Sequence, residues 1–186
     1  VDNLSKGKRE LVDKKAIFTG LDVDNVYKIP FLLENEGIVE ILNEKLKLDL
    51  KPLDDPWKQL LSNLEHPRQE ITIALCGKYT SLTDSYASIK EALMHCSAHT
   101  KALVNMKFIE TTEIEERKIS VADSLRGING VIVPGGFGSR GVEGKLEVIK
   151  HCRENKIPLL GICFGLQLMV VEFARNVCLL EKANTR

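Results

Sequence analysis

The sequence has 186 residues, and its 26 basic and 26 acidic side chains cancel to a formal net charge of zero. With 44% hydrophobic and 28% charged residues it has the composition of a globular domain, and its charge balance gives no support for broad binding to nucleic acid or to an anionic membrane. The longest apolar stretch, at 157–171, is interrupted by glycine and glutamine and falls short of the ~20 residues of a membrane span.

The first third of the chain predicts short strands and two amphipathic helices. Apolar runs predict strands at 16–18 and 26–29. Apolar residues spaced three and four apart predict a helix at 38–46, and the Asp-Pro pair at 55–56 is typical of the start of another. A polar stretch with a proline, at 65–70, predicts a domain boundary.

Beyond this boundary strands and helices alternate. Strands are predicted at 71–76, 103–109, 130–133 and 158–160, and helices at 84–97, 121–125, 142–154 and 164–179. Such alternation predicts an α/β fold, with a parallel sheet flanked by helices on both faces. The last strand lies at about 157–162, so we expect the sheet to be incomplete at the C-terminus.

One segment has the spacing of a nucleophile elbow. Gly161-Ile162-Cys163-Phe164-Gly165 follows the last predicted strand as Gly-x-Cys-x-Gly. A nucleophile in an elbow stands on a sharp, strained turn, and glycines two residues before and after it avoid collisions with the strand and the helix. The helix N-terminus also favours a thiolate, the reactive form of cysteine. The alternative is a structural cysteine in a glycine-rich turn.

The other four cysteines, Cys76, Cys96, Cys152 and Cys178, are interpreted as small apolar residues. The odd total and the absence of Cys-x-x-Cys spacing disfavour a disulfide framework and a zinc cluster. We therefore expect no metal site in this chain, and Cys163 to be the most reactive thiol.

A second glycine-rich segment, at 134–141, follows the predicted strand at 130–133. Paired glycines let backbone N–H groups turn toward an anion or an oxyanion. The segment lacks the spacing of a P-loop and of a dinucleotide-binding fingerprint, so phosphate binding has weak support. Because it lies at the same sheet edge as the elbow, we interpret it as part of an oxyanion hole.

The two segments together resemble the class I glutamine amidotransferase domain of the CTP synthase family. The matching residues are Pro-Gly-Gly-Phe-Gly-x-Arg-Gly-x-Glu-Gly at 134–144 and Leu-Gly-Ile-Cys-Phe-Gly-Leu-Gln at 160–167, with shorter matches such as Gly-Lys-Tyr at 77–79. The resemblance covers about residues 70–183 and implies a flavodoxin-like fold. Residues 16–50 resemble the end of the synthetase domain that precedes it.

The expected domains follow from this resemblance. Residues 1–66 would be the end of the synthetase domain with the interdomain linker, and residues 70–186 the N-terminal part of the amidotransferase domain. The chain begins at Val1 without a methionine or a signal-peptide pattern, and we expect it to be part of a longer protein.

The resemblance also implies roles for single residues. Cys163 would attack the side-chain amide of L-glutamine, giving a γ-glutamyl thioester and ammonia. The N–H groups of Gly136 and Phe164 would hold the oxyanion. The glutamine pocket would be formed by Phe164, Gly165, Leu166 and Gln167. A region linked to activation by GTP would include Phe137, Arg140, Gly141 and Glu143. For Arg140 and Glu143 the alternative is a surface charge pair at the start of a helix.

Members of the family pass the ammonia to a synthetase domain, where ATP has phosphorylated UTP and displacement gives CTP. The resemblance thus implies ATP and Mg²⁺ for the full enzyme, GTP as allosteric activator, a homotetramer and a cytoplasmic location. For this chain it implies L-glutamine as the ligand, and no cofactor, nucleic acid or membrane.

The sequence departs from the family in one catalytic feature. Members supply a general-base His and an orienting Glu from a His-x-Glu motif downstream of the cysteine, and residues 164–186 contain no His. The four histidines, His66, His95, His99 and His151, are predicted in the linker or toward helix ends, away from the elbow. We expect this partial chain to be inactive alone. The alternatives are a non-catalytic remnant and another class I glutamine amidotransferase with a cysteine elbow.

Overall fold

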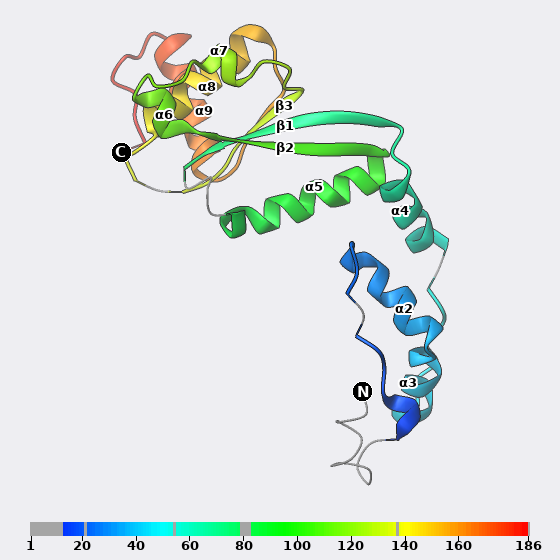
Figure 1. The fold of residues 1–186 in the computed structure, drawn as a ribbon. Helices are drawn as coiled ribbons and strands as arrows, with labels where there is room; N and C mark the ends of the chain where they lie inside the picture. Colours follow the sequence, from blue (N-terminus) through cyan, green and yellow to red (C-terminus); the bar gives the residue numbers. More distant parts are fainter. Residues whose placement is uncertain (1–12, 21, 54, 79–82, 137, 186) are drawn as a thin grey trace. The chain divides into compact units, whose positions relative to one another are not determined.

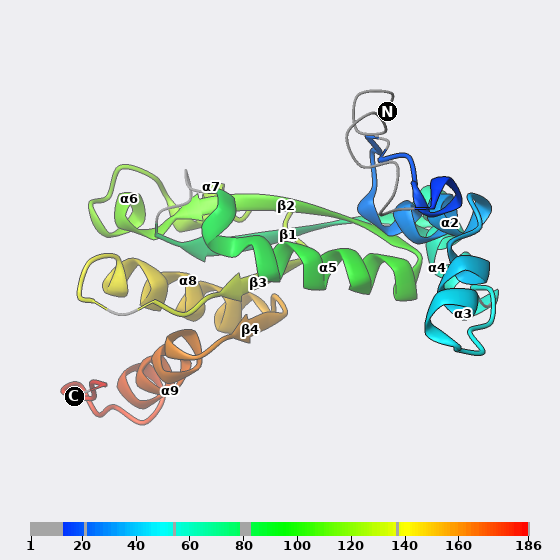
Figure 2. The ribbon, with the colours of Figure 1, turned by 90° about the horizontal axis from the view of Figure 1, so that it is seen from below.

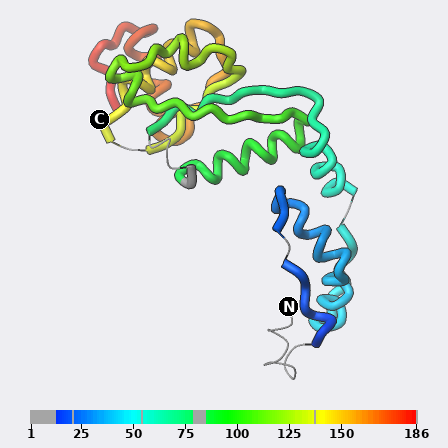
Figure 3. Tube along the Cα trace, in the orientation of Figure 1, coloured from blue at the N-terminus to red at the C-terminus, as the bar shows by residue number. Residues whose placement is uncertain are grey.

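The computed structural model describes residues 13–185 except 21, 54, 79–82 and 137. The chain divides into two compact units, which meet in the sequence between His66 and Pro67. Figures 1 and 3 follow both units from blue at the N-terminus to red at the C-terminus.

The described elements of the first unit are all helical. They are the 3₁₀ helices η1 (Lys14–Ala16) and η2 (Val26–Lys28) and the α-helices α2 (Ile29–Asn35), α3 (Ile38–Leu46) and α4 (Asp55–Glu65). The helix predicted at 38–46 is confirmed as α3. The second is confirmed as α4, in which Asp55 is the first helical residue and Pro56 stands in the first turn.

The strands predicted at 16–18 and 26–29 are wrong, because local hydrogen bonds favour turns there. The side chain of Asn25 accepts a hydrogen bond from the N–H of Tyr27 at 2.9 Å, which draws the next residues into η2. Pro30 then lies in the first turn of α2, where its missing N–H costs no helical hydrogen bond. A similar Asp side-chain cap opens η1.

The second unit is built on a four-stranded sheet in which all pairs are parallel (Figure 2). Its strands are β1 (Gln69–Gly77), β2 (Ala102–Glu110), β3 (Gly130–Val133) and β4 (Leu159–Gly161), in the order β2-β1-β3-β4. The predicted parallel sheet is confirmed. From β1 the chain adds β2 on one side, and it then adds β3 and β4 on the other side of β1. The strand order therefore changes direction between β1 and β3, and parallel sheets of this kind bind ligands in the crevice at the carboxyl ends of two such strands.

Helices cover both faces of this sheet (Figures 1 and 2). One face carries α5 (Ala87–Thr100), which follows the 3₁₀ helix η3 (Thr83–Tyr86). The other face carries α6 (Thr111–Glu115), α7 (Val121–Ser124), α8 (Val142–Asn155) and α9 (Phe164–Asn176). Leu75 of β1 packs in the cluster under α5, whereas its neighbours Ala74 and Cys76 pack with α8 and α9. This alternation shows that the strand is buried on both faces.

In the second unit the helix predicted at 164–179 ends three residues early, at Asn176, and two further differences concern α5 and α6. The helix predicted from residue 84 begins as a 3₁₀ turn and becomes α-helical at Ala87. The single turn α6 was not predicted, because five residues are too few to show a helical period. It buries Thr111, Thr112 and Ile114 at the end of β2.

The position of α8 is set by close contacts at its start and by an ion pair near its end. A Cβ on Gly144 would come within 2.0 Å of the carbonyl oxygen of Thr111, so α8 lies directly on α6. At the other end Arg153 donates to both carboxylate oxygens of Glu172 in α9, at distances of 2.8 to 3.2 Å. The Glu172 side chain is 1% exposed, so this ion pair holds α8 and α9 together inside the unit.

An apolar stripe on α9 faces solvent in this chain. Leu166, Val170, Phe173 and Val177 are spaced at helical intervals, and Val170 is 64% exposed. Among the described strands β4 pairs only with β3, so it forms one edge of the sheet. None of the described helices combines the length and the apolar character needed to cross a bilayer.

We expect Gly144→Ala to lower the free energy of unfolding of the second unit by about 3 kcal/mol or more, because the added methyl group collides with backbone. Chemical denaturation followed by circular dichroism measures the change. Gly20→Ala is the control, since no described atom lies within 4 Å of its Cβ position. A loss below about 1 kcal/mol for Gly144→Ala would contradict the tight docking of α8 on α6.

Candidate active site

Cys163 stands between β4 and α9 in a strained backbone conformation. Its φ is +53° and its ψ is −111°, a combination that L-residues rarely adopt, and it is the N-cap residue of α9. Holding a non-glycine residue in such a region costs about 1–3 kcal/mol. The thiol is exposed. The turn therefore presents a nucleophile to solvent at the N-terminus of a 13-residue helix.

The two glycines of the elbow are needed because backbone atoms occupy the space of their side chains. A Cβ on Gly165 would lie 2.0 Å from the carbonyl oxygen of Val133 in β3. A Cβ on Gly161 would lie 2.7 Å from the backbone nitrogen of Leu166 and 2.6 Å from the sulfur of Met169. The structure thus gives the Gly-x-Cys-x-Gly spacing a steric cause at both positions.

The loop after β3 lies against the nucleophile. The Cβ position of Gly135 is 3.4 Å from the Cβ of Cys163 and 3.8 Å from its sulfur. The N–H of Ile162 donates to the carbonyl of Val133 at 2.9 Å, which ties the elbow to the base of this loop. Gly136 follows with φ at +120°, a conformation that favours glycine. The two glycine-rich segments of the sequence therefore meet at one edge of the sheet.

The residues assigned to the glutamine pocket take different positions around the elbow. Phe164 and Gly165 are buried, whereas Leu166 and Gln167 are exposed on the first turn of α9. Phe164 lines a cleft of about 520 Å³ beside the loop. The other lining residues are Gly138, Ser139, Val142, Glu143, Arg175, Asn184 and Thr185.

Two residues assigned to the effector region, Glu143 and Arg140, line different pockets. Glu143 lines the cleft beside Phe164 and forms an ion pair with Arg175 of α9 at 3.2 Å. Arg175 also donates to the carbonyl of Ala183 at 2.8 Å, so it connects α8, α9 and the segment that follows α9. Gly141, with φ at +78°, donates its N–H to the Glu115 carboxylate.

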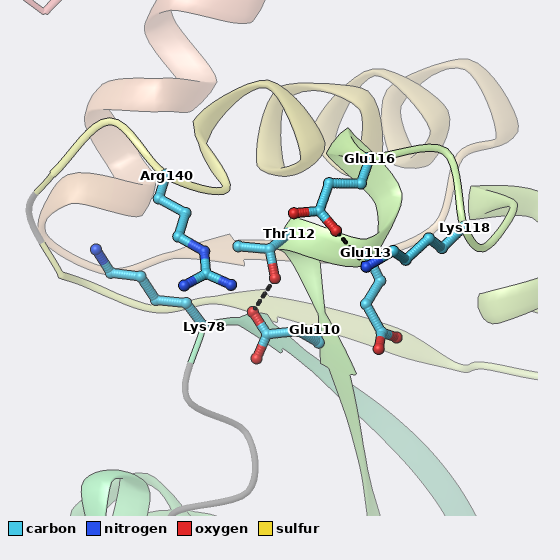
Figure 4. A pocket seen from close by; sticks show the side chains of 7 residues that line it. All are labelled: Lys78, Glu110, Thr112, Glu113, Glu116, Lys118 and Arg140. Carbon is cyan, nitrogen blue, oxygen red and sulfur yellow. Dashed lines mark hydrogen bonds and ion pairs between the residues drawn. The ribbon is translucent and has the colours of Figure 1, made fainter.

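Arg140 lies on the other side of the loop, in a pocket of about 280 Å³ (Figure 4). Lys78 lines the same pocket, as do acidic side chains from β2 and α6, and its ammonium nitrogen lies 3.2 Å from the Cβ position of Gly138 in the loop. Thr112 donates to Glu110 at 2.8 Å, and Lys118 pairs with Glu116. The remaining lining residue is Glu113. Phe137, which was assigned to the same region, lies outside the described residues.

Sequence analysis missed Lys145, a lysine that is 2% exposed. Its ammonium nitrogen lies 3.4 Å from the carbonyl oxygen of Pro134 and 5.8 Å from the centre of the Phe164 ring. The helical spacing of Val142, Lys145, Leu146 and Ile149 places it on the buried face of α8, and this was the signal available. Burial lowers the pKa of Lys145, and the nearby charge of Lys78 lowers it further, against the opposing effects of Glu110 and Cys76.

The reactive group at this edge of the sheet is the thiol of Cys163, and the backbone of the glycine loop lies beside it. Within the described ranges, no three His, Cys, Asp or Glu side chains are grouped so that they could ligate one metal ion. The arrangement can thus support nucleophilic attack by sulfur beside the backbone of the loop and of the start of α9.

We expect native alkylation at neutral pH to spare Cys76 and Cys152, which are buried and whose pKa values burial raises to about 12 and about 11. Iodoacetamide followed by peptide mapping should label Cys163 fastest, ahead of the exposed Cys96 and Cys178, because only Cys163 stands on an elbow. Labelling of the buried pair at the rate of Cys163 would contradict this packing.

The second unit is similar to known proteins. The family model "Glutamine amidotransferase class-I" matches residues 81–186. A solved structure of the glutaminase domain of Trypanosoma brucei CTPS with bound acivicin aligns with a TM-score of 0.51 and 34% sequence identity. The alignment covers 57% of this chain and 41% of that chain, so the chain spans well under half of this solved relative. The chain belongs to the class I glutamine amidotransferase family.

Proposed function

We propose that the unit from Pro67 to Arg186 is the glutamine-hydrolysing part of a CTP synthase, with Cys163 as its nucleophile. One observation carries the proposal: the strained, exposed Cys163 lies in contact range of the glycine loop that follows β3. The 34% identity to a CTPS glutaminase domain supports CTP synthase over other members of the family.

The first half of the reaction follows from the elbow. The thiolate of Cys163 attacks the carboxamide carbon of glutamine, and the electron pair of the C=O bond moves to the oxygen. The N–H groups of Gly136 and Phe164 hold this oxyanion, and an oriented donor of this kind contributes about 10²–10³-fold to the rate. Collapse of the tetrahedral intermediate breaks the C–N bond, and with one proton added to the nitrogen ammonia leaves the γ-glutamyl thioester behind.

The second half needs a general base that activates water against the thioester. The three histidines of the second unit are poorly placed for that role. His95 and His99 lie in the last turns of α5, and His151 lies six residues beyond Lys145 in α8, about 9 Å farther from the site along the helix axis. His66 belongs to the first unit. A His-x-Glu segment, as in other members, would complete the site.

The remaining parts of the proposal concern the whole enzyme. The first unit would be the end of the synthetase domain, which receives the ammonia and uses ATP, Mg²⁺ and UTP. The pocket that contains Arg140 and Lys78 lies on the loop assigned to GTP activation, which supports that assignment. A homotetramer in the cytoplasm is the expected form of the complete protein.

We expect the 186-residue chain to release glutamate from glutamine at least about 100-fold more slowly than the same chain extended by a His-x-Glu segment. The reason is that general acid–base catalysis contributes about 10²–10⁴-fold to the rate. A coupled assay for glutamate measures both. Cys163→Ala in the extended chain should reduce the rate to background.

Equal rates for the printed and extended chains would mean that a residue in this sequence serves as the base. A Cys163→Ala variant of the extended chain that keeps its activity would refute the assignment of the nucleophile. Loss of activity in the extended chain from the outset, with Cys163 still reactive, would favour the non-catalytic remnant.

A further inference from the structure

Lys145 is a fully buried cation for which the proposed reaction has no use so far. It is the fourth residue of α8, and burial of a lysine ammonium group is costly unless it makes specific interactions. Its described contacts are with Pro134, which begins the glycine loop, and with Phe164, which follows the nucleophile. Lys145 thus touches Phe164, one of the two assigned oxyanion donors, and Pro134, which stands two residues before the other, Gly136.

The contact with Pro134 has a geometric consequence. The peptide between Pro134 and Gly135 is trans and planar, so its C=O and N–H groups point in opposite directions. Because Lys145 binds the carbonyl from inside the unit, the N–H of Gly135 points away from the interior. Gly135 is also the residue whose Cβ position lies 3.8 Å from the sulfur of Cys163. One hydrogen bond therefore sets the first peptide plane beside the nucleophile.

The contact with Phe164 acts on the other side of the site. The ammonium group lies 5.8 Å from the centre of the ring, within the range of about 6 Å for a cation–π interaction. This attraction holds the first side chain of α9 against the end of β3. Lys145 therefore connects the loop, through Pro134, with the elbow, through Phe164.

The surroundings of Lys145 are of mixed charge. Three titratable groups affect the pKa of Lys145. They are Cys76 near the end of β1, Lys78 just after β1, and Glu110 at the end of β2. No full counter-ion pair with Lys145 occurs among the described residues. The hydrogen bond to Pro134 requires only an N–H donor, which a lysine provides in either protonation state.

We propose that Lys145 is a positioning residue of the glutaminase site: by binding the Pro134 carbonyl and the Phe164 ring, it holds the peptide that leads into Gly136 and the start of α9, and so positions the loop and elbow N–H groups that receive the oxyanion. The inference rests on the proposed function of Cys163. It concerns a side chain that touches neither substrate nor the reacting atoms.

The test compares two reagents on Cys163. The thiolate of Cys163 first adds to the carbonyl carbon of a chloro-ketone analogue of glutamine, which forms an oxyanion. The sulfur then displaces chloride from the adjacent carbon, and the carbonyl re-forms. Iodoacetamide loses iodide to the thiolate in a direct displacement that forms no oxyanion. Lys145→Met keeps the length of the side chain and removes the donor, and Lys150→Met, at an exposed position of the same helix, is the matched control.

In Lys145→Met we expect labelling of Cys163 by the chloro-ketone at pH 7 to slow about tenfold, less than the loss of a whole donor, while iodoacetamide labelling changes less than about twofold. Lys150→Met should match the unaltered chain with both reagents. Peptide mapping by mass spectrometry gives both rates.

Other results overturn the proposal. An unchanged chloro-ketone rate in Lys145→Met would show that the Pro134 contact does not govern the oxyanion site. Equal slowing with both reagents would show a general loss of thiol access. If the chloro-ketone fails to label Cys163 in the unaltered chain while iodoacetamide succeeds, the proposed function itself fails, and this inference fails with it.

Thermal unfolding tests the burial on which the inference depends. Because the pKa of Lys145 is lowered in the folded state, the unfolded chain binds more protons between the folded and unfolded pKa values, and stability rises with pH in that window. Lys145→Met lacks this titration. We therefore expect the variant to unfold at a higher temperature at pH 7, and the difference from the unaltered chain to narrow as pH rises through the lowered folded-state pKa toward 10.5. A difference independent of pH would contradict the burial of a titrating ammonium group.

Discussion

The start of α9 lies so close to the end of β3 that no side-chain atom fits between them. This approach, of Gly165 to the Val133 carbonyl, fixes where the helix begins and how high Cys163 stands above the sheet edge. Close-packed interiors transmit such constraints because there is no space in which they can relax. The loop that continues from Val133 is thereby brought against Cys163, whose backbone has a positive φ of 53° in the same turn.

The loop from Pro134 to Gly141 then acts as a ridge between two hollows. On one side are Glu143 and Arg175, which connect α8 to the segment after α9. On the other side are Arg140 and Lys78, which line a pocket together with acidic side chains of β2 and α6 (Figure 4). Residues that are neighbours in the sequence thus serve different surfaces, because the chain turns into α8 between them.

The sequence was sufficient to predict those parts of the second unit in which packing or sterics allows a single arrangement. Alternating apolar segments predict the parallel sheet because βαβ units leave few other arrangements, and the glycines at 161 and 165 predict the elbow because only glycine fits there. The first unit was predicted less well. There a single Asn side chain outweighed strand propensity, and its hydrogen bond is a local event that apolar periodicity does not report.

The contacts of Lys145 and the pairing of Glu143 with Arg175 could not have been deduced in the same way, although helical spacing indicates the face of α8 on which Lys145 lies. A lysine at an apolar position of a helix is usually expected to extend its head group to solvent, and its burial depends on the loop above it. The partner of Glu143 lies 32 residues away in the sequence, so the contact exists only once α8 and α9 have packed. Long-range polar contacts of this kind follow from the fold and carry no local pattern.

The strained turn at Cys163 and the buried ammonium group of Lys145 both oppose folding. The elbow glycines, in contrast, are demanded by packing whether or not any reaction takes place. Evolutionary drift under selection for stability alone would therefore retain Gly161 and Gly165 and replace Cys163 with glycine and Lys145 with an apolar residue. Two side chains that destabilise the fold, Cys163 and Lys145, occur together here. Their presence distinguishes a site retained for its chemistry from a turn retained only for packing.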